Sequence, residues 1–157
     1  MWWRLKRSEF EKEQGGGNKT AMQAIVNSGE VPGILVYHEQ KAVAWCSIAP
    51  RANFASLNRS FVLKPLDDQP VWSIVCLFID KQYRKSGLTE QVIKCAIDYA
   101  KTQGANIVEA YPTQPKKAEL PPVSSFMGIP AMYEKLGFVA CARPSASKVV
   151  MRFYIKK

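Results

Sequence analysis

The chain has 157 residues, and this length predicts a single domain over residues 1–157. It is 47% hydrophobic and 22% charged, which is ordinary for a globular protein, and no stretch is long and apolar enough to span a bilayer. The formal net charge of +9 fits three anionic partners: nucleic acid, a membrane surface or a polyanionic small molecule. Because Lys and Arg are spread along the chain without a long basic run or an RNA-binding signature, nucleic acid is not an expected partner.

The start of the chain and the cysteines indicate the compartment. Residues 1–7 lack the apolar core and cleavage site of a signal peptide, which predicts a cytoplasmic protein. The four cysteines are far apart, and the only histidine, His38, lies near a predicted hairpin turn. Zinc needs closely spaced ligands, so we expect no metal site and reduced cysteines that pack as small hydrophobic residues.

The first third of the chain predicts two helices and a hairpin. Residues 5–14 are charged and predict a short surface helix that ends at three glycines. The next helix runs to Gly29 and begins either at Asn18 or at a capping box that starts at Thr20. Residues 34–39 and 42–48 then predict a β-hairpin with its turn at residues 40–41.

Residues 50–70 form a long connection without periodicity. Loops of this length in compact domains are often functional or mobile. Three roles remain open for this connection: acceptor binding, a lid, or an oligomer contact. The last role would make a homodimer possible.

Residues 71–104 predict one strand–turn–helix unit. Residues 71–79 are almost continuously apolar, as in a strand covered on both faces. A polar turn ends at Gly87, and from Leu88 apolar residues recur every four positions until Gly104 stops the helix. A basic glycine turn before a helix brings free N–H groups and the positive end of the helix dipole together, which indicates a phosphate-binding cradle.

The last third completes an α/β fold. Residues 106–111 predict a strand parallel to residues 71–79, because strand, helix and strand at this spacing imply a right-handed crossover. Residues 113–128 predict an irregular insertion, and a short helix follows from Pro130. A final strand pair is predicted at residues 138–142 and 148–155. The whole is an α/β class domain, with a mixed, mostly antiparallel sheet and helices on both faces.

Two segments resemble motifs of the GCN5-related N-acetyltransferase (GNAT) family. Arg84-Lys85-Ser86-Gly87-Leu88-Thr89 resembles its Arg/Gln-x-x-Gly-x-Gly/Ala signature, and Met132-Tyr133-Glu134-Lys135-Leu136-Gly137-Phe138 resembles its later Tyr-Glu-x-x-Gly-Phe segment. Thr89 departs from the usual glycine or alanine. The resemblance implies a GNAT-like sheet with a splayed parallel central strand pair. It also implies direct transfer of an acetyl group from acetyl-CoA to a small-molecule amine or an exposed amino group.

The resemblance also implies the site residues. The pantetheine arm of acetyl-CoA would lie beside the main chain of Leu77, Phe78 and Ile79. The pyrophosphate would be held by the turn made of Arg84, Lys85, Ser86, Gly87, Leu88 and Thr89. Tyr133 matches the family's tyrosine that protonates the departing CoA thiolate, and a tyrosine packed on the sheet is the alternative.

A general base is the least defined part of the expected site. An alkyl ammonium has a pKa of about 10, so the acceptor must lose a proton before it attacks. Glu109, on the strand beside residues 71–79, is the candidate, and a structural carboxylate is the alternative. The carboxylates of Asp67, Asp68 and Asp80 also remain open.

Two other function classes remain open. The first is an acyl-CoA-binding module without turnover, suggested by Thr89 and by the lack of a clear base. The second is a basic protein that interacts with nucleic acid. A ping-pong reaction through Cys76 is not expected, because a cysteine in a buried apolar strand should have a raised pKa.

Overall fold

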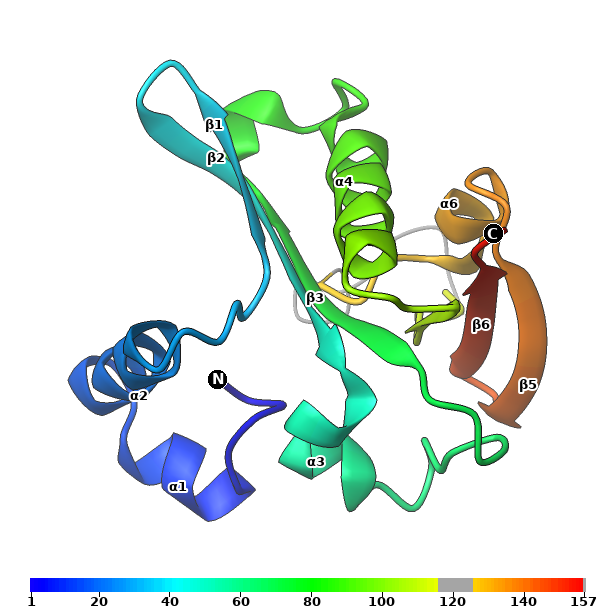
Figure 1. Cartoon of the computed structure of the whole chain (residues 1–157), viewed down its shortest axis with the longest axis horizontal. Coiled ribbons are helices and arrows are strands. Elements are labelled where there is room, and N and C mark those ends of the chain that lie inside the picture. The colour runs from blue at the N-terminus through cyan, green and yellow to red at the C-terminus, as the bar shows by residue number, and fades with distance from the viewer. Residues whose placement is uncertain (116–125, 157) are drawn as a thin grey trace.

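The chain folds around one six-stranded sheet in a computed structural model that describes residues 1–115 and 126–156 (Figure 1). The strand order is β1-β2-β3-β4-β6-β5, and β3 and β4 form its parallel pair. The strands are β1 (Ile34–His38), β2 (Lys41–Pro50), β3 (Trp72–Ile79), β4 (Ile107–Ala110), β5 (Val139–Ser145) and β6 (Lys148–Tyr154). The predicted mixed, mostly antiparallel sheet is confirmed.

Helices lie on both faces of the sheet, as expected. They are α1 (Arg7–Lys12), α2 (Gly16–Asn27), α3 (Ala55–Asn58), α4 (Leu88–Thr102) and α6 (Pro130–Glu134), with 3-10 turns η1 (Arg51–Asn53) and η2 (Lys81–Tyr83). On one face α4 packs against β1, β2 and β3 through the apolar stripe predicted from the sequence (Figure 1). On the other face α3 and the segment around Trp3 cover a second apolar cluster.

Two local boundaries differ from the sequence predictions. Helix α2 begins at Gly16, before both predicted caps, because Gly15 adopts a φ of 78° as its N-cap residue. The Thr20 hydroxyl instead donates to the Gly16 carbonyl inside the helix, and the Asn18 amide donates to the Phe10 carbonyl. The hairpin turn also lies one residue earlier than predicted, since Lys41 already pairs with His38.

The central parallel pair opens toward the carboxyl ends of its strands. Pairing between β3 and β4 stops at Ile74 and Ala110, although β3 continues to Ile79. Beyond that point the Leu77 N–H donates to the Phe126 carbonyl at 2.7 Å. The register between β2 and β3 also shifts at Ser47, which leaves an extra residue in β3, and such bulges bend a strand. The expected splay is therefore present.

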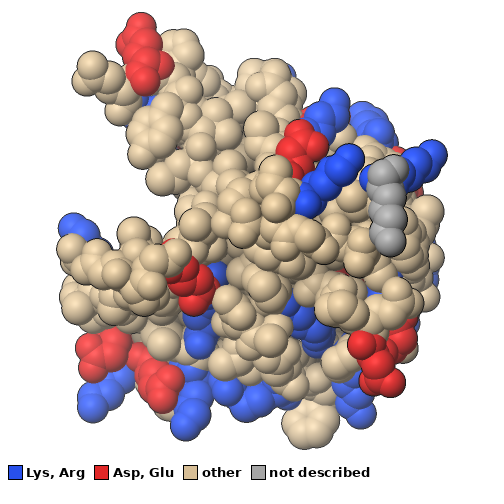
Figure 2. Space-filling model, in the orientation of Figure 1, with Lys and Arg blue, Asp and Glu red and all other residues tan. Residues whose placement is uncertain are grey.

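On the face seen in Figure 2 the charged side chains are dispersed. Figure 2 shows Lys and Arg side chains scattered over the viewed face, with Asp and Glu among them rather than one basic patch. Within residues 1–115 and 126–156, no helix is long and apolar enough to cross a membrane.

Candidate active site

A cavity of about 300 Å³, here called the strand-end cavity, lies where β3 ends and α4 begins. Five of the predicted cofactor residues line it: Leu77, Phe78 and Ile79 from β3, with Arg84 and Thr89. The other lining residues are Phe126, Gly128, Ile129 and Met132. The fold thus brings the splayed strand and the start of α4 to one cavity.

The turn before α4 has a backbone suited to an anion. Gly87 is the N-cap residue with a φ of 81°, and it makes no side-chain cap hydrogen bond to the first turn. Lys85 also has a positive φ, 63°, which is uncommon for a residue with a side chain and is often found at functional sites. Unused N–H donors at a helix start, together with the helix dipole, favour phosphate binding.

Side chains in this turn divide between the cavity and solvent. The Arg84 Nε donates to the Ile79 carbonyl at 3.2 Å, which holds the guanidinium against the end of β3. Ser86 is exposed, and its hydroxyl donates to the Tyr83 carbonyl. The four predicted residues between Arg84 and Thr89 are not among the lining residues of the strand-end cavity: Lys85, Ser86, Gly87 and Leu88.

Tyr133 lies in α6, fully buried beside the splay. Its ring packs edge-on against Phe138 with centroids 5.0 Å apart. Its hydroxyl has no hydrogen-bond partner among the described residues, and burial raises its pKa well above the usual value, so the proton is retained. Tyr133 lines neither cavity described here, although its neighbour Met132 lines the strand-end cavity.

Gly128 packs closely against Tyr133 and was not identified from the sequence. Its φ is 72°, and a Cβ there would lie 2.4 Å from the Met132 Cε and 3.0 Å from the Tyr133 Cε2. A glycine just before the Pro130 helix was the available signal. The segment that holds Gly128 and Phe126 follows residues 116–125, so much of the predicted insertion at 113–128 lies outside the described residues.

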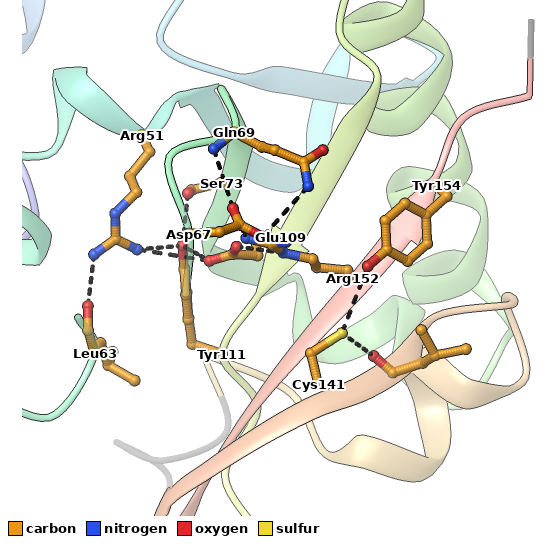
Figure 3. Close-up of polar contacts among 11 residues, drawn as sticks. Arg51, Leu63, Asp67, Gln69, Ser73, Glu109, Tyr111, Cys141, Arg152 and Tyr154 are labelled. Atoms are coloured by element: carbon orange, nitrogen blue, oxygen red, sulfur yellow. Dashed lines mark hydrogen bonds and ion pairs between the residues drawn. The ribbon is translucent and has the colours of Figure 1, made fainter. Parts of the chain in front are cut away.

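Glu109, the candidate base, lies in a buried ion-pair network (Figure 3). Its carboxylate accepts hydrogen bonds from the Arg152 Nε at 2.8 Å and the Tyr111 hydroxyl at 3.0 Å, and the Arg51 guanidinium lies 3.6 Å away. It is 1% exposed and lines neither cavity. These contacts favour the structural alternative for Glu109.

The same ion-pair network also bonds to the long connection at residues 50–70 that precedes β3. Arg152 donates to both carboxylate oxygens of Asp67, at 2.6 and 2.9 Å, and the Arg51 guanidinium donates to the Leu63 carbonyl. The hydrogen bonds from Arg152 lower the pKa of Asp67. Asp80, another open candidate, pairs with Lys41 at 2.8 Å, which lowers its pKa as well.

A second, larger cavity of about 700 Å³ lies beside the first, between the amino-terminal segment and the sheet. We call it the aromatic cavity because Trp2, Trp3 and Trp45 line it. Phe126 lines both cavities, so they adjoin at this side chain. Cys76 also lines the aromatic cavity, and burial raises its pKa as expected from the sequence.

The mixed α/β fold described above recurs among solved structures. The NatC complex bound to Gag peptide and CoA is 11% identical, with a TM-score of 0.58 over 87% of this chain and 79% of that chain. A GNAT acetyltransferase from Streptococcus pneumoniae is 15% identical, with a TM-score of 0.58 over 91% and 78%. The ribosomal-protein-S18-alanine N-acetyltransferase of Escherichia coli is 15% identical, with a TM-score of 0.52 over 98% and 79%.

The sequence comparison identifies the family. The sequence model of the acetyltransferase (GNAT) family matches residues 1–138, which is most of the chain. The chain therefore belongs to the GNAT family, as the two motifs indicated. None of the curated proteins compared with it matches its sequence.

Proposed function

We propose that this protein transfers an acetyl group from acetyl-CoA directly to an amine in a ternary complex. The observation that carries the proposal is the strand-end cavity, where the splayed end of β3, Arg84 and the uncapped start of α4 meet. Acetyl-CoA would supply an acetyl group activated as a thioester.

The residues around the strand-end cavity fit this co-substrate. The N–H groups of residues 87–89 and the Arg84 guanidinium would hold the pyrophosphate, with Lys85 and Ser86 at the edge of the turn. The main chain of Leu77, Phe78 and Ile79 would lie beside the pantetheine arm. The Leu77 N–H already donates to the Phe126 carbonyl, so this N–H could bond to the pantetheine arm only if the Phe126 carbonyl moved away.

Tyr133 is proposed as the general acid. In the transfer, the amine nitrogen bonds to the acetyl carbon, the carbon–sulfur bond breaks, and the thiolate takes a proton while the amine loses one. The Tyr133 hydroxyl is protonated and has no partner among the described residues, so it would be free to donate to a thiolate that reaches it. Tyr133 lines neither cavity, and the thiolate would approach it past its neighbour Met132, which lines the strand-end cavity.

Water in the aromatic cavity, which adjoins the strand-end cavity, is proposed as the base that takes the amine proton. Glu109 would serve only if its buried ion pairs with Arg152 and Arg51 opened. Acceptors of two kinds fit the proposal: a small amine that enters the aromatic cavity, or an exposed amino group. The second has a parallel in the name of the S18-alanine N-acetyltransferase, whose fold is similar.

Binding of the co-substrate provides the first experiment. A ligand at about 100 times its Kd stabilises a protein by roughly 2.7 kcal/mol, so saturating acetyl-CoA should raise the melting temperature. Arg84→Gln should reduce the shift, whereas Lys101→Gln, at the exposed far end of α4, should not. If acetyl-CoA and CoA both fail to shift the wild-type protein, the proposal fails.

Turnover provides the second experiment. Free-thiol detection with a panel of amines distinguishes a transferase from a module that only binds acyl-CoA, since the latter shows a shift without thiol release. Mass spectrometry after incubation with acetyl-CoA alone tests direct transfer. An acetyl adduct on Cys76 that disappears when amine is added would show a covalent route instead.

A further inference from the structure

The aromatic cavity has the size and lining of a site for a small apolar molecule. Its volume of about 700 Å³ lies within the range of ligand sites, about 300–1,000 Å³. Trp2, Trp3 and Trp45 contribute to its wall, and three phenylalanines, Phe10, Phe54 and Phe126, add further aromatic rings. An aromatic or long aliphatic group could bury its surface here.

The described residues that line this cavity carry positive charges only. Among the described residues that line it there is no Asp or Glu, and the charged groups are Arg4, Lys148 and the α-ammonium of Met1, whose pKa is lowered by burial. Arg4 is neutralised by Glu30, whose Oε1 lies 2.5 Å from the guanidinium. Neither Lys148 nor the Met1 α-ammonium has such a partner in the described part of the chain, so Lys148 is the lining side chain whose charge is left uncompensated.

Lys148 is positioned to bind an anion. It is half-buried at the start of β6, and its Nζ donates to the Thr113 Oγ1 at 2.9 Å, which leaves other N–H donors on the ammonium. Burial lowers its pKa, so a carboxylate close to it would restore what the ammonium loses by leaving water. A polyamine or a cationic peptide would instead place like charges together, with no carboxylate among the described lining residues to offset them.

We propose that the acceptor is a hydrophobic amino acid, whose apolar side chain fills the aromatic cavity and whose carboxylate binds Lys148. Because the amine and the carboxylate share one carbon, the amine would lie close to Lys148. Lys148 is hydrogen-bonded to Thr113, whose N–H donates to the carbonyl of Gly128, a lining residue of the strand-end cavity. The claim that the bound amine is acetylated rests on the proposed function, whereas the claim about binding does not.

The binding claim can be tested on the wild-type protein by calorimetry without acetyl-CoA. Phenylalanine should bind about tenfold or more tightly than phenylalaninamide, which lacks the carboxylate, because a hydrogen bond to a charged group contributes about 1.5–3 kcal/mol. Glycine and spermidine should bind more weakly still. Equal or tighter binding of phenylalaninamide or spermidine would overturn the inference.

A variant pair locates the carboxylate. Lys148→Met keeps the length of the apolar stem and should weaken phenylalanine binding about tenfold, with little effect on phenylalaninamide. Lys94→Met, on the exposed side of α4, is the matched control and should change neither. Unchanged phenylalanine binding in Lys148→Met would overturn the assignment, and if this variant does not fold, the wild-type comparison above still decides.

The two proposals fail in different ways. In one outcome, phenylalanine binds through its carboxylate, but no N-acetylphenylalanine forms when acetyl-CoA is added. This outcome would support the cavity assignment and count against the transferase. Acetylation of amines with no preference for a carboxylate would support the transferase and overturn the cavity assignment.

Discussion

Replacing Tyr133 with phenylalanine should raise stability and remove activity at the same time. The Tyr133 hydroxyl is fully buried and has no partner among the described residues. A buried polar group without a partner costs about 1–3 kcal/mol, and phenylalanine keeps the ring contact with Phe138. In a domain of this size each kcal/mol shifts the melting temperature by about 2–4 °C, so Tyr133→Phe should melt at least a few degrees higher than the wild type.

Activity should change in the opposite direction. General acid catalysis contributes about 10²–10⁴-fold, and kcat of Tyr133→Phe should fall on that scale while acetyl-CoA affinity is retained. Thermal melts, calorimetry with CoA, and free-thiol release with an acceptor from the amine panel measure the three quantities.

Tyr111→Phe is a matched comparison, because Tyr111 is equally buried but its hydroxyl is fully bonded. That hydroxyl accepts from Arg51 at 2.8 Å, donates to Glu109 at 3.0 Å and lies 2.7 Å from the Ser73 hydroxyl. Its loss should lower stability by about 1–3 kcal/mol and leave kcat nearly unchanged below the melting temperature. Full turnover in Tyr133→Phe, or a lower melting temperature than the wild type, would refute this reasoning.

Three further predictions concern Glu109, Asp67 and Thr89. Glu109→Gln should lose about 3–5 kcal/mol of stability in denaturant melts, because Arg152 loses a buried charged partner. Its kcat in the folded fraction should stay near normal. Normal stability with a large loss of kcat would instead identify Glu109 as the base. The folded pKa of Asp67 is lowered, so its stabilising effect is present above the unfolded pKa of about 3.9 and is lost as pH falls through the folded pKa. Asp67→Asn should therefore melt below the wild type at neutral pH, with a difference that shrinks toward about pH 2, and a constant difference would contradict this. Thr89→Gly should weaken CoA binding in calorimetry, because it removes a hydroxyl that would bond a phosphate oxygen and because glycine costs on the order of 1 kcal/mol in the helical turn that would hold the pyrophosphate. Thr102→Gly has the same helical cost in the last turn of α4, away from the strand-end cavity, and should leave CoA binding unchanged. Tighter binding by Thr89→Gly would show that Thr89 crowds the site.

Local sequence pattern determined the central unit of this protein. Three features could be read from short stretches of sequence, because each depends only on residues close together in the chain. They are the apolar run at 71–79, the four-residue spacing from Leu88 and the glycine turn between them. The structure has β3, α4 and a left-handed Gly87 at these places. The parallel pairing with β4 also followed, because the handedness of a crossover is a general property of the chain.

Only the tertiary structure decided the surroundings of the candidate catalytic groups. From the sequence, Glu109 was a candidate because it is a carboxylate on the strand beside the cofactor strand. Its partners Arg152 and Arg51 are 43 and 58 residues away in the chain, and no local sequence pattern predicts such an ion pair. The aromatic cavity likewise combines Trp2, Trp45 and Lys148, which meet only when the amino-terminal segment packs beside the sheet. Side-chain pairing and enclosed volume depend on contacts between distant parts of the chain, and hydrophobic periodicity carries no information on them.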